Sequence, residues 1–260
     1  RSTPLYSSAA SDVYKRQLFS FIIFIILWWT VQFVSNSPPY ILPNPYKVFL
    51  SIQNNFLLLT YHSYITFFEI LAGFILGIFF GIYTGILLIL SKSMRKWMLP
   101  FIILTQAIPI FAIAPILTLW VGYGIWSKII MTTLIIYFPI TIAFFDGLKR
   151  IDPMIINLAK MMGASTYTML IKIRIPFALP QLTSGLKLAA AFAPMGAVIG
   201  EWVGSSEGLG YLMLYASGRV QIDLMFASII ILAFFTILLY NLVSFISNYI
   251  TRWDPKSHIN

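Results

Sequence analysis

Residues 64–90 read YITFFEILAGFILGIFFGIYTGILLIL, and Glu69 is the only charged side chain among them. A helix needs about 20 mainly apolar residues to cross the hydrocarbon core of a bilayer. This stretch is longer than that, so it predicts a transmembrane helix. Similar stretches without charge recur along the chain, which indicates a membrane protein with several spans.

The composition excludes a soluble enzyme. Only 10% of the 260 residues are charged, whereas a typical soluble domain has roughly 25%. Apolar residues make up 59% of the chain, and the mean hydropathy is +0.87. The absence of cysteine excludes disulfides and thiolate chemistry. Two histidines far apart in the sequence (His62 and His258) argue against a histidine metal site, and we expect no metal.

The apolar stretches predict an all-α, polytopic membrane fold. The most economical division has six helices at about 18–35, 64–90, 98–120, 127–146, 181–203 and 224–250. Together they form a single transmembrane domain over 18–250, followed by a short tail at 251–260. Residues 1–17 are polar and have no apolar core, and we interpret them either as a foreign leader or as a short native tail.

The basic residues predict the orientation of the spans. With the N-terminus inside, the outer segments hold only Lys47, Lys128 and Arg219, whereas most other Lys and Arg residues fall in inner segments. This bias favours both termini in the cytoplasm. The net charge of +9 then reflects positive charge held at one membrane face, and we expect no nucleic-acid partner.

Four glycines follow one another at four-residue spacing in the second predicted span. They are Gly73, Gly77, Gly81 and Gly85. On a helix these positions form one ridge, along which a neighbouring backbone can approach closely. The ridge predicts helix packing within the bundle, with a subunit interface or a moving gate as the alternatives.

Prolines interrupt three of the predicted spans. Each removes an intrahelical hydrogen bond and bends its helix, and such breaks persist in a membrane only where protein groups or water satisfy the freed carbonyls. The third span contains three prolines, which suggests a wall bent around a pathway. The candidate residues of a translocation pathway are Gln106, Pro109, Pro115, Pro194 and Glu201.

Glu201 is the only acidic residue in the second half of the predicted membrane region. An ionisable group inside a membrane is costly and marks a functional hypothesis. The alternative is that Glu201 lies at the outer interface, since Gly204 and Ser205 follow it closely. We expect Glu69 and Asp146, at the ends of their spans, to be interfacial.

The inner loop at 149–180 has the pattern of two short amphipathic helices around a glycine corner. Asp152 and Pro153 are typical of a helix start, and Gly163 ends that helix. Ser165 or Thr166 can cap a second helix, which Pro176 is expected to close. Such a hairpin suits the docking of a soluble partner in a groove. The alternative is a hairpin that lies flat on the lipid surface.

The same loop resembles the cytoplasmic signature of the permease subunits of type I ATP-binding-cassette (ABC) importers. That signature is Glu-Ala-Ala, three residues, Gly, nine residues, then Ile-x-Leu-Pro. Asn157 stands here in place of the Glu, Leu158 in place of the first Ala, and Ile175 in place of the Leu. The resemblance implies coupling to an ATPase through Asn157, Leu158, Ala159, Gly163, Ala164, Ile173 and Pro176.

The resemblance extends over most of residues 38–250. The stretches PPYILPNPYKVF (38–49), AIPIFAIAPILTLWVGYGIWSK (107–128) and GEWVGSSEGLGYLM (200–213) are similar to the nitrate/sulfonate/taurine branch of these importers. Within that branch, the last stretch together with GRVQIDLMFA (218–227) most resembles permeases placed beside thiamine-precursor (hydroxymethylpyrimidine) binding proteins.

The resemblance implies a type I importer permease fold in a bacterial plasma membrane. It implies an ABC ATPase subunit that holds ATP and Mg²⁺, an extracytoplasmic solute-binding protein, a second permease copy in a homodimer, and membrane lipid around them. This chain contains no G-x-x-x-x-G-K-[ST] phosphate loop, and we expect it to hold no cofactor and no catalytic residue.

Two other functions remain as alternatives. A secondary transporter or channel would have an internal repeat and paired ionisable groups in the membrane, and a lipid-modifying enzyme would have clustered polar side chains at one depth. The expected solute is a thiamine precursor such as hydroxymethylpyrimidine, or a sulfonate, taurine or nitrate. No Lys or Arg falls in the middle of a predicted span, which favours a neutral heterocycle over an anion.

Overall fold

The computed structural model describes residues 19, 22–23, 25–35 and 38–253. The predicted leader at 1–17 and most of the predicted tail therefore lie outside the described residues. Within the described part the chain is all-α and has no strand, which confirms the predicted fold class. The labelled helices are α2 (Pro45–Asn54), α3 (Phe56–Leu90), α4 (Lys92–Ala107), α5 (Ile110–Val121), α6 (Ile125–Lys149), α7 (Pro153–Met161), α8 (Thr166–Met169), α9 (Ile175–Gly204), α10 (Leu209–Gly218) and α11 (Ile222–Ile250).

Four described helices are long and apolar enough to cross a membrane. They are α3, α6, α11 and a continuous helix over Thr166–Gly204, in which a π-helical turn (Leu170–Arg174) joins α8 to α9. A shorter apolar helix, Ile25–Ser35, occupies the described part of the first predicted span. Five of the six predicted spans therefore each correspond to one apolar helix, the first of them in its described part.

The third predicted span is a broken pair, which corrects the prediction of one bent helix. The axes of α4 and α5 meet at 103° across a short break. Ile108 is extended there, as the residue before a proline usually is, and Pro109 stands at the N-cap of α5. Pro100 and Pro115 are accommodated inside α4 and α5. Of the three prolines, only Pro109 breaks the chain's helical path.

The glycine ridge of α3 lies against α6. A Cβ atom added to Gly77 would come 2.5 Å from Cδ1 and Cγ1 of Ile136, so the two helices approach more closely than any larger residue would allow. The partners on α6 are themselves spaced by four residues. The other pairs are Gly73 with Thr132, Gly81 with Ile140, and Gly85 with Phe144.

Helix α9 packs on α6 in the same manner. A Cβ on Gly196 would lie 2.5 Å from Cα of Thr132, and one on Gly200 would lie 2.9 Å from Cα of Lys128. Thr132 therefore lies between a glycine of α3 and a glycine of α9. The main buried apolar cluster is built largely by α3, α6, α9 and α11.

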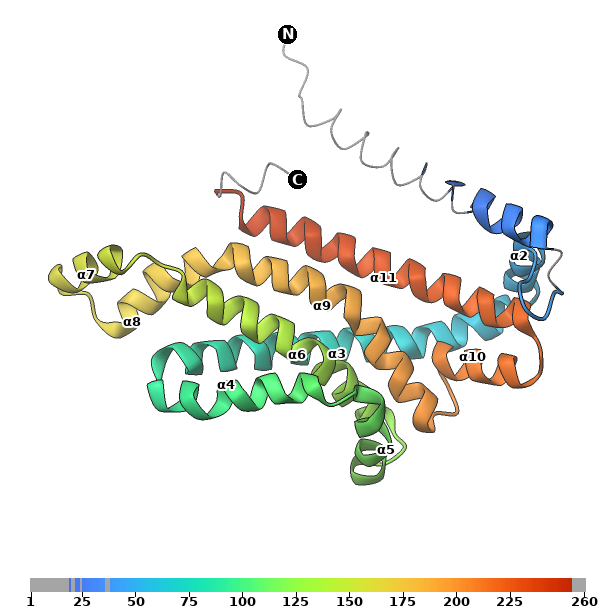
Figure 1. The fold of residues 1–260 in the computed structure, drawn as a ribbon, viewed down its shortest axis with the longest axis horizontal. Coiled ribbons are helices and arrows are strands. Elements are labelled where there is room, and N and C mark those ends of the chain that lie inside the picture. Colours follow the sequence, from blue (N-terminus) through green and yellow to red (C-terminus); the bar gives the residue numbers. More distant parts are fainter. Residues whose placement is uncertain (1–18, 20–21, 24, 36–37, 254–260) are drawn as a thin grey trace, which may run out of the picture.

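The two ends of the bundle differ. Helices α7 and α8 project beyond one end, and α10 lies at the other (Figure 1). We call these the hairpin end and the α10 end. Pro176 does not end the second helix of the loop, which corrects the prediction from the sequence: a π-helical turn precedes Pro176, and the helix continues to Gly204. Proline has no N–H to donate, and the wider turn, in which Ile175 N bonds Leu170 O, ends directly before it.

Candidate functional site

The hairpin is held in shape by local capping. Asp152 Oδ1 accepts a hydrogen bond from Met154 N at 2.8 Å, and Pro153 occupies the first turn of α7. Gly163 has a φ of +79°, in the left-handed region that favours glycine. Ser165 Oγ then accepts from Thr168 N at 3.1 Å and starts α8. The capping residues singled out in the sequence therefore form the corner.

The predicted coupling residues do not share one surface. Asn157, Leu158 and Gly163 are exposed, whereas Ala159 is buried. Three of the predicted residues are half-buried, namely Ala164, Ile173 and Pro176.

An exposed apolar surface covers the outside of the hairpin. Met161 is 86% exposed and Met162 is 79% exposed, and Leu158 adds to the same region. Met154 and Tyr167 are also largely exposed. Neither these methionines nor Tyr167 is among the coupling residues predicted from the sequence. The only indication of them in the sequence is that apolar residues recur in the loop between two predicted spans.

The hairpin is tied to the bundle by Arg174. Its guanidinium donates a hydrogen bond of 3.0 Å to the carbonyl oxygen of Leu148, near the end of α6. Gly147 also packs tightly there, since an added Cβ would lie 2.9 Å from Cα of Ala178. Arg174 therefore ties the end of the hairpin to α6, and the Gly147–Ala178 contact holds α6 and α9 together beside it.

A cavity of about 350 Å³ lies at the break between α4 and α5. Gln106 and Pro109, two of the candidate pathway residues, line it. The walls are apolar except for the Gln106 amide and the Thr105 hydroxyl, and no charged side chain contributes. The other lining residues are Ile108, Ile110, Ile135, Phe138, Pro139, Leu188, Phe192 and Met195.

The remaining candidate pathway residues lie elsewhere. Pro115 is exposed on α5 and Pro194 is buried in α9, and neither lines the α4–α5 cavity. Glu201 is at the α10 end and is only 1% exposed. The structure thus brings together two of the five candidate pathway residues.

Glu201 holds the beginning of α10. Its Oε2 accepts hydrogen bonds from the backbone N–H groups of Gly210 and Tyr211. Its Oε1 accepts from Thr66 Oγ1 at 2.6 Å. A carboxylate at a helix N-terminus satisfies N–H groups that have no intrahelical partner. Glu201 is therefore buried and hydrogen-bonded within the protein, and its side chain is not exposed at the surface.

Two side chains of α3 complete this cap. Leu209 N donates to Thr66 Oγ1 at 2.7 Å, and Gly208 N donates to His62 Nδ1 at 3.0 Å. Any Cβ on Gly208, which has a φ of +104°, would collide with the Glu201 carboxyl group. The Glu-Gly-Leu-Gly segment at 207–210 is thus shaped to let the Glu201 carboxylate reach the backbone of α10.

Glu69 and Lys128 are both buried in the protein at the α10 end, which the sequence did not indicate. Glu69, expected at an interface, is 2% exposed, and Lys128, expected in an outer loop, is 4% exposed. Lys128 Nζ donates to the carbonyl oxygens of Tyr123 at 2.7 Å and Gly124 at 3.0 Å. Asp146 is exposed near the end of α6.

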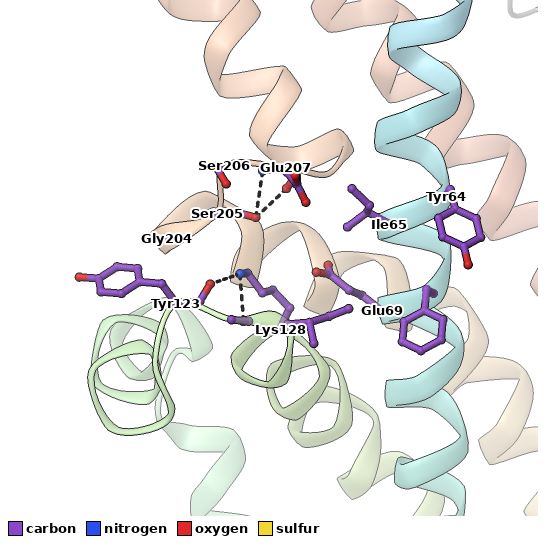
Figure 2. Close-up of a pocket in the computed structure, with 12 residues that line it drawn as sticks. Tyr64, Ile65, Glu69, Tyr123, Lys128, Gly204, Ser205, Ser206 and Glu207 are labelled. Carbon is purple, nitrogen blue, oxygen red and sulfur yellow. Dashed lines mark hydrogen bonds between the residues drawn. The ribbon is translucent and has the colours of Figure 1, made fainter.

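A second cavity, of about 770 Å³, opens beside these buried charges (Figure 2). Helix α3, the start of α6 and the loop between α9 and α10 form its walls. We call it the α10-end cavity. Its lining residues are Tyr64, Ile65, Phe68, Glu69, Tyr123, Gly124, Ile125, Lys128, Gly204, Ser205, Ser206 and Glu207. Among the described residues, no three His, Cys, Asp or Glu side chains are grouped to hold a metal ion.

Known proteins resemble this chain along most of its length. It is 46% identical to a probable ABC transporter permease protein of Haemophilus influenzae, over 84% of this chain and 89% of that protein. It is 32% identical to the formylaminopyrimidine transport permease protein ThiX of Halalkalibacterium halodurans, over 91% of this chain and 95% of that protein. The taurine transport system permease protein TauC of Escherichia coli is 27% identical over 90% of this chain and 88% of its own.

A solved structure has the same fold. It is a chain of the MetNI methionine ABC transporter in an inward-facing conformation, with a TM-score of 0.66, 19% identity, and coverage of 75% of this chain and 97% of that chain. The family model described as the inner membrane component of binding-protein-dependent transport systems matches residues 73–253. These findings confirm the resemblance seen in the sequence: the chain belongs to the permease family of ABC importers, in the nitrate/sulfonate/taurine branch.

Proposed function

We propose that this chain forms the translocation pathway of an ATP-driven solute importer and couples to a separate ATPase through residues 152–176. The observation that carries the proposal is the exposed apolar surface of the hairpin around Leu158, Met161 and Met162. Apolar side chains concentrated on a rigid, capped element are typical of a docking surface for another protein. ATP and Mg²⁺ belong to the partner in this account, and the permease itself is not catalytic.

The position of the hairpin favours protein docking over a lipid-surface role. A helix that binds the lipid surface lies in the plane of the interface with its apolar face toward the acyl chains. Here α7 and α8 project beyond the end of the bundle (Figure 1). Their exposed methionines therefore suit a groove in a soluble partner.

A path for mechanical coupling leads from the hairpin into the bundle. The helix over Thr166–Gly204 is continuous, so a displacement of the hairpin is transmitted along α9. The same helix contributes Leu188, Phe192 and Met195 to the α4–α5 cavity. Closure of the ATPase pair on ATP would therefore move one wall of the proposed pathway.

The membrane arrangement follows from this coupling. The hairpin end would face the cytoplasm, with both chain termini on that side, and the α10 end would face the solute-binding protein outside. A second copy of the chain would complete the pathway. The excess of Lys and Arg in the predicted inner segments supports this orientation.

The proposed solute is a small neutral or weakly charged heterocycle of the thiamine-precursor type. The α4–α5 cavity has aromatic and aliphatic walls, with a Gln106 amide and a Thr105 hydroxyl as its polar groups. A sulfonate, taurine or nitrate would find no positive side chain there. The similarity to the formylaminopyrimidine permease supports the same choice.

The test is co-purification with the ATPase subunit. The tagged permease, expressed with its candidate ATPase, is extracted in mild detergent, and the bound ATPase is quantified together with its hydrolysis rate. A roughly two-to-two complex is expected for the unmodified permease. Met161→Glu places a charge on the docking surface and is expected to release the ATPase, because burying an unpaired charge in an apolar interface is costly.

Met94→Glu is the matched control. Met94 is 45% exposed on α4, outside the hairpin, so its complex should keep the ATPase. A permease that purifies alone in all three forms would contradict the proposal and favour a secondary transporter. An intact complex with Met161→Glu would show that the hairpin is not the docking surface.

A further inference from the structure

We propose that Asp146, Lys149 and Arg150 form a gate that closes the pathway at the hairpin end, by pairing with the same residues of a second copy of this chain. The proposal rests on the proposed function, since it concerns the pathway and the second copy named there, and it adds how that pathway is closed. The gate residues stand at the end of α6 and are distinct from the exposed apolar surface of the hairpin.

A charged cavity lies where α6 and α9 meet at the hairpin end. Its volume is about 420 Å³, and its lining residues are Asp146, Lys149 and Arg150 at the end of α6 and Gln181 on α9. The three charged residues are exposed, whereas Gln181 is half-buried. All four lining side chains are polar, in contrast to the mainly apolar walls of the α4–α5 cavity. We call it the charged cavity.

The charged cavity lies on the same face of α6 and α9 as the α4–α5 cavity. Asp146 follows Pro139 by seven residues on α6, and Leu188 follows Gln181 by seven residues on α9. Seven residues make close to two helical turns, so the members of each pair share one face and are about 10 Å apart along the helix. The proposed pathway therefore continues from the α4–α5 cavity to the charged cavity at the hairpin end.

The charged cavity holds side chains of both signs that do not pair with one another. Asp146 and Lys149 are three residues apart on one helix, a spacing at which opposite charges can interact. Within the described part of the chain, however, none of the four lining side chains makes a hydrogen bond or an ion pair. One acid and two bases are thus left available to another chain.

A second copy of this chain carries the matching charges. In a dimer with two-fold symmetry, a contact of residue i with residue j is repeated as a contact of j with i. Asp146 of each copy can therefore pair with Lys149 or Arg150 of the other, which gives two equivalent contacts across the pathway. An anionic lipid headgroup would be attracted by the bases but repelled by Asp146. An apolar partner would bury all three charges unpaired, which is costly.

The gate is connected to both ends of the hairpin. Asp152, the N-cap of α7, follows Arg150 by two residues. At the other end of the hairpin, Arg174 donates its hydrogen bond to the carbonyl oxygen of Leu148, which lies next to Lys149 in α6. A displacement of the hairpin by the ATPase would therefore shift the end of α6 and its charges.

The experiment follows the gate with a cysteine at Ser184. This residue is exposed on α9 between the two cavities, and cysteine has nearly the same size as serine. Because the chain has no native cysteine, a neutral maleimide labels the permease only there. The purified permease–ATPase complex is labelled with and without a non-hydrolysable ATP analogue. We expect the analogue to slow labelling at position 184, whereas Ser93→Cys, exposed on α4, should label equally fast in both states.

Charge reversal in two separately tagged copies tests the pairing. One copy carries Asp146→Lys, and the other carries Lys149→Asp and Arg150→Asp, so that the three gate charges have one sign within each copy. Complexes of two identical variant copies should lose about tenfold of the protection, roughly the effect of removing two exposed ion pairs. A mixed dimer, isolated through both tags, places opposite charges only across the two copies and should regain the protection. Asp146→Asn in both copies, which adds no repulsion, should lose part of it.

The outcomes separate the gate from the proposed function. No recovery in the mixed dimer, or full protection with Asp146→Asn, would overturn the gate. If the same complexes bind the ATPase and hydrolyse ATP, the importer function would still stand. A permease that binds no ATPase would overturn both.

Discussion

Replacement of Glu201 by alanine is expected to release the N-terminus of α10 from the bundle. The substitution removes the acceptor of the Gly210 and Tyr211 N–H groups and of the Thr66 hydroxyl. Glu201 is 1% exposed, so water does not readily replace it. Each buried donor left unpaired costs about 1–3 kcal/mol. With two backbone donors left unpaired, the free energy that holds the start of α10 against the bundle should fall by about 2–6 kcal/mol.

The absence of native cysteine makes this opening measurable. A single cysteine at Ala216, which is fully buried in α10, reacts with a thiol reagent only when α10 lifts. When reclosing is fast, the labelling rate follows the open population. At the lower bound of 2 kcal/mol, Glu201→Ala should accelerate labelling about 30-fold. Glu201→Gln, which keeps one acceptor oxygen, should have a smaller effect.

Ser247→Cys provides the control for global unfolding. Ser247 is 2% exposed on α11, far from α10 along that helix. Its labelling should not change with Glu201→Ala. An unchanged rate at position 216, or an equal acceleration at both positions, would refute the view that Glu201 holds α10 locally.

Two further substitutions test the packing of the bundle and the hairpin. Gly77→Val should destabilise the permease by about 1–3 kcal/mol, because its side chain meets Ile136; Ile136→Ala should restore part of the loss, as measured by size-exclusion chromatography after heating. Arg174→Ala removes the hydrogen bond to Leu148 O and should speed chymotrypsin cleavage of the hairpin, whereas an unchanged cleavage rate would show that this bond does not restrain it. Gly163→Asn should keep more ATPase bound than Gly163→Val, because Asn tolerates positive φ; equal retention would contradict a need for left-handed backbone at the corner.

The features that could be predicted from the sequence are those set by local rules. Long apolar runs predicted the spans, and the caps of the hairpin were visible as Asp152, Gly163 and Ser165. Each depends on residues a few positions apart. The four-residue spacing of the glycines on α3 is a pattern of the same kind, and the structure places these residues against α6.

The features that could not be predicted depend on contacts between distant segments. The burial of Glu69 and Lys128 results from the way α3, α6 and the α9–α10 loop meet. Glu201 finds its partners on α3 and α10, and no spacing in the sequence indicates them. The continuation of the helix past Pro176 required a π-helical turn, for which the sequence provides no clear signal.

Site-specific cross-linking shows whether the hairpin docks on the ATPase, and it requires no knowledge of the solute. A cysteine at Met161, which would be the only thiol of this chain, is joined to a photoreactive probe in native membranes. We expect a cross-link to the ATPase subunit from this position, and none from a cysteine at Leu214, which is exposed on α10 at the opposite end. A probe at position 161 that reacts only with lipid would contradict docking of the hairpin on the ATPase and would place the hairpin on the membrane surface.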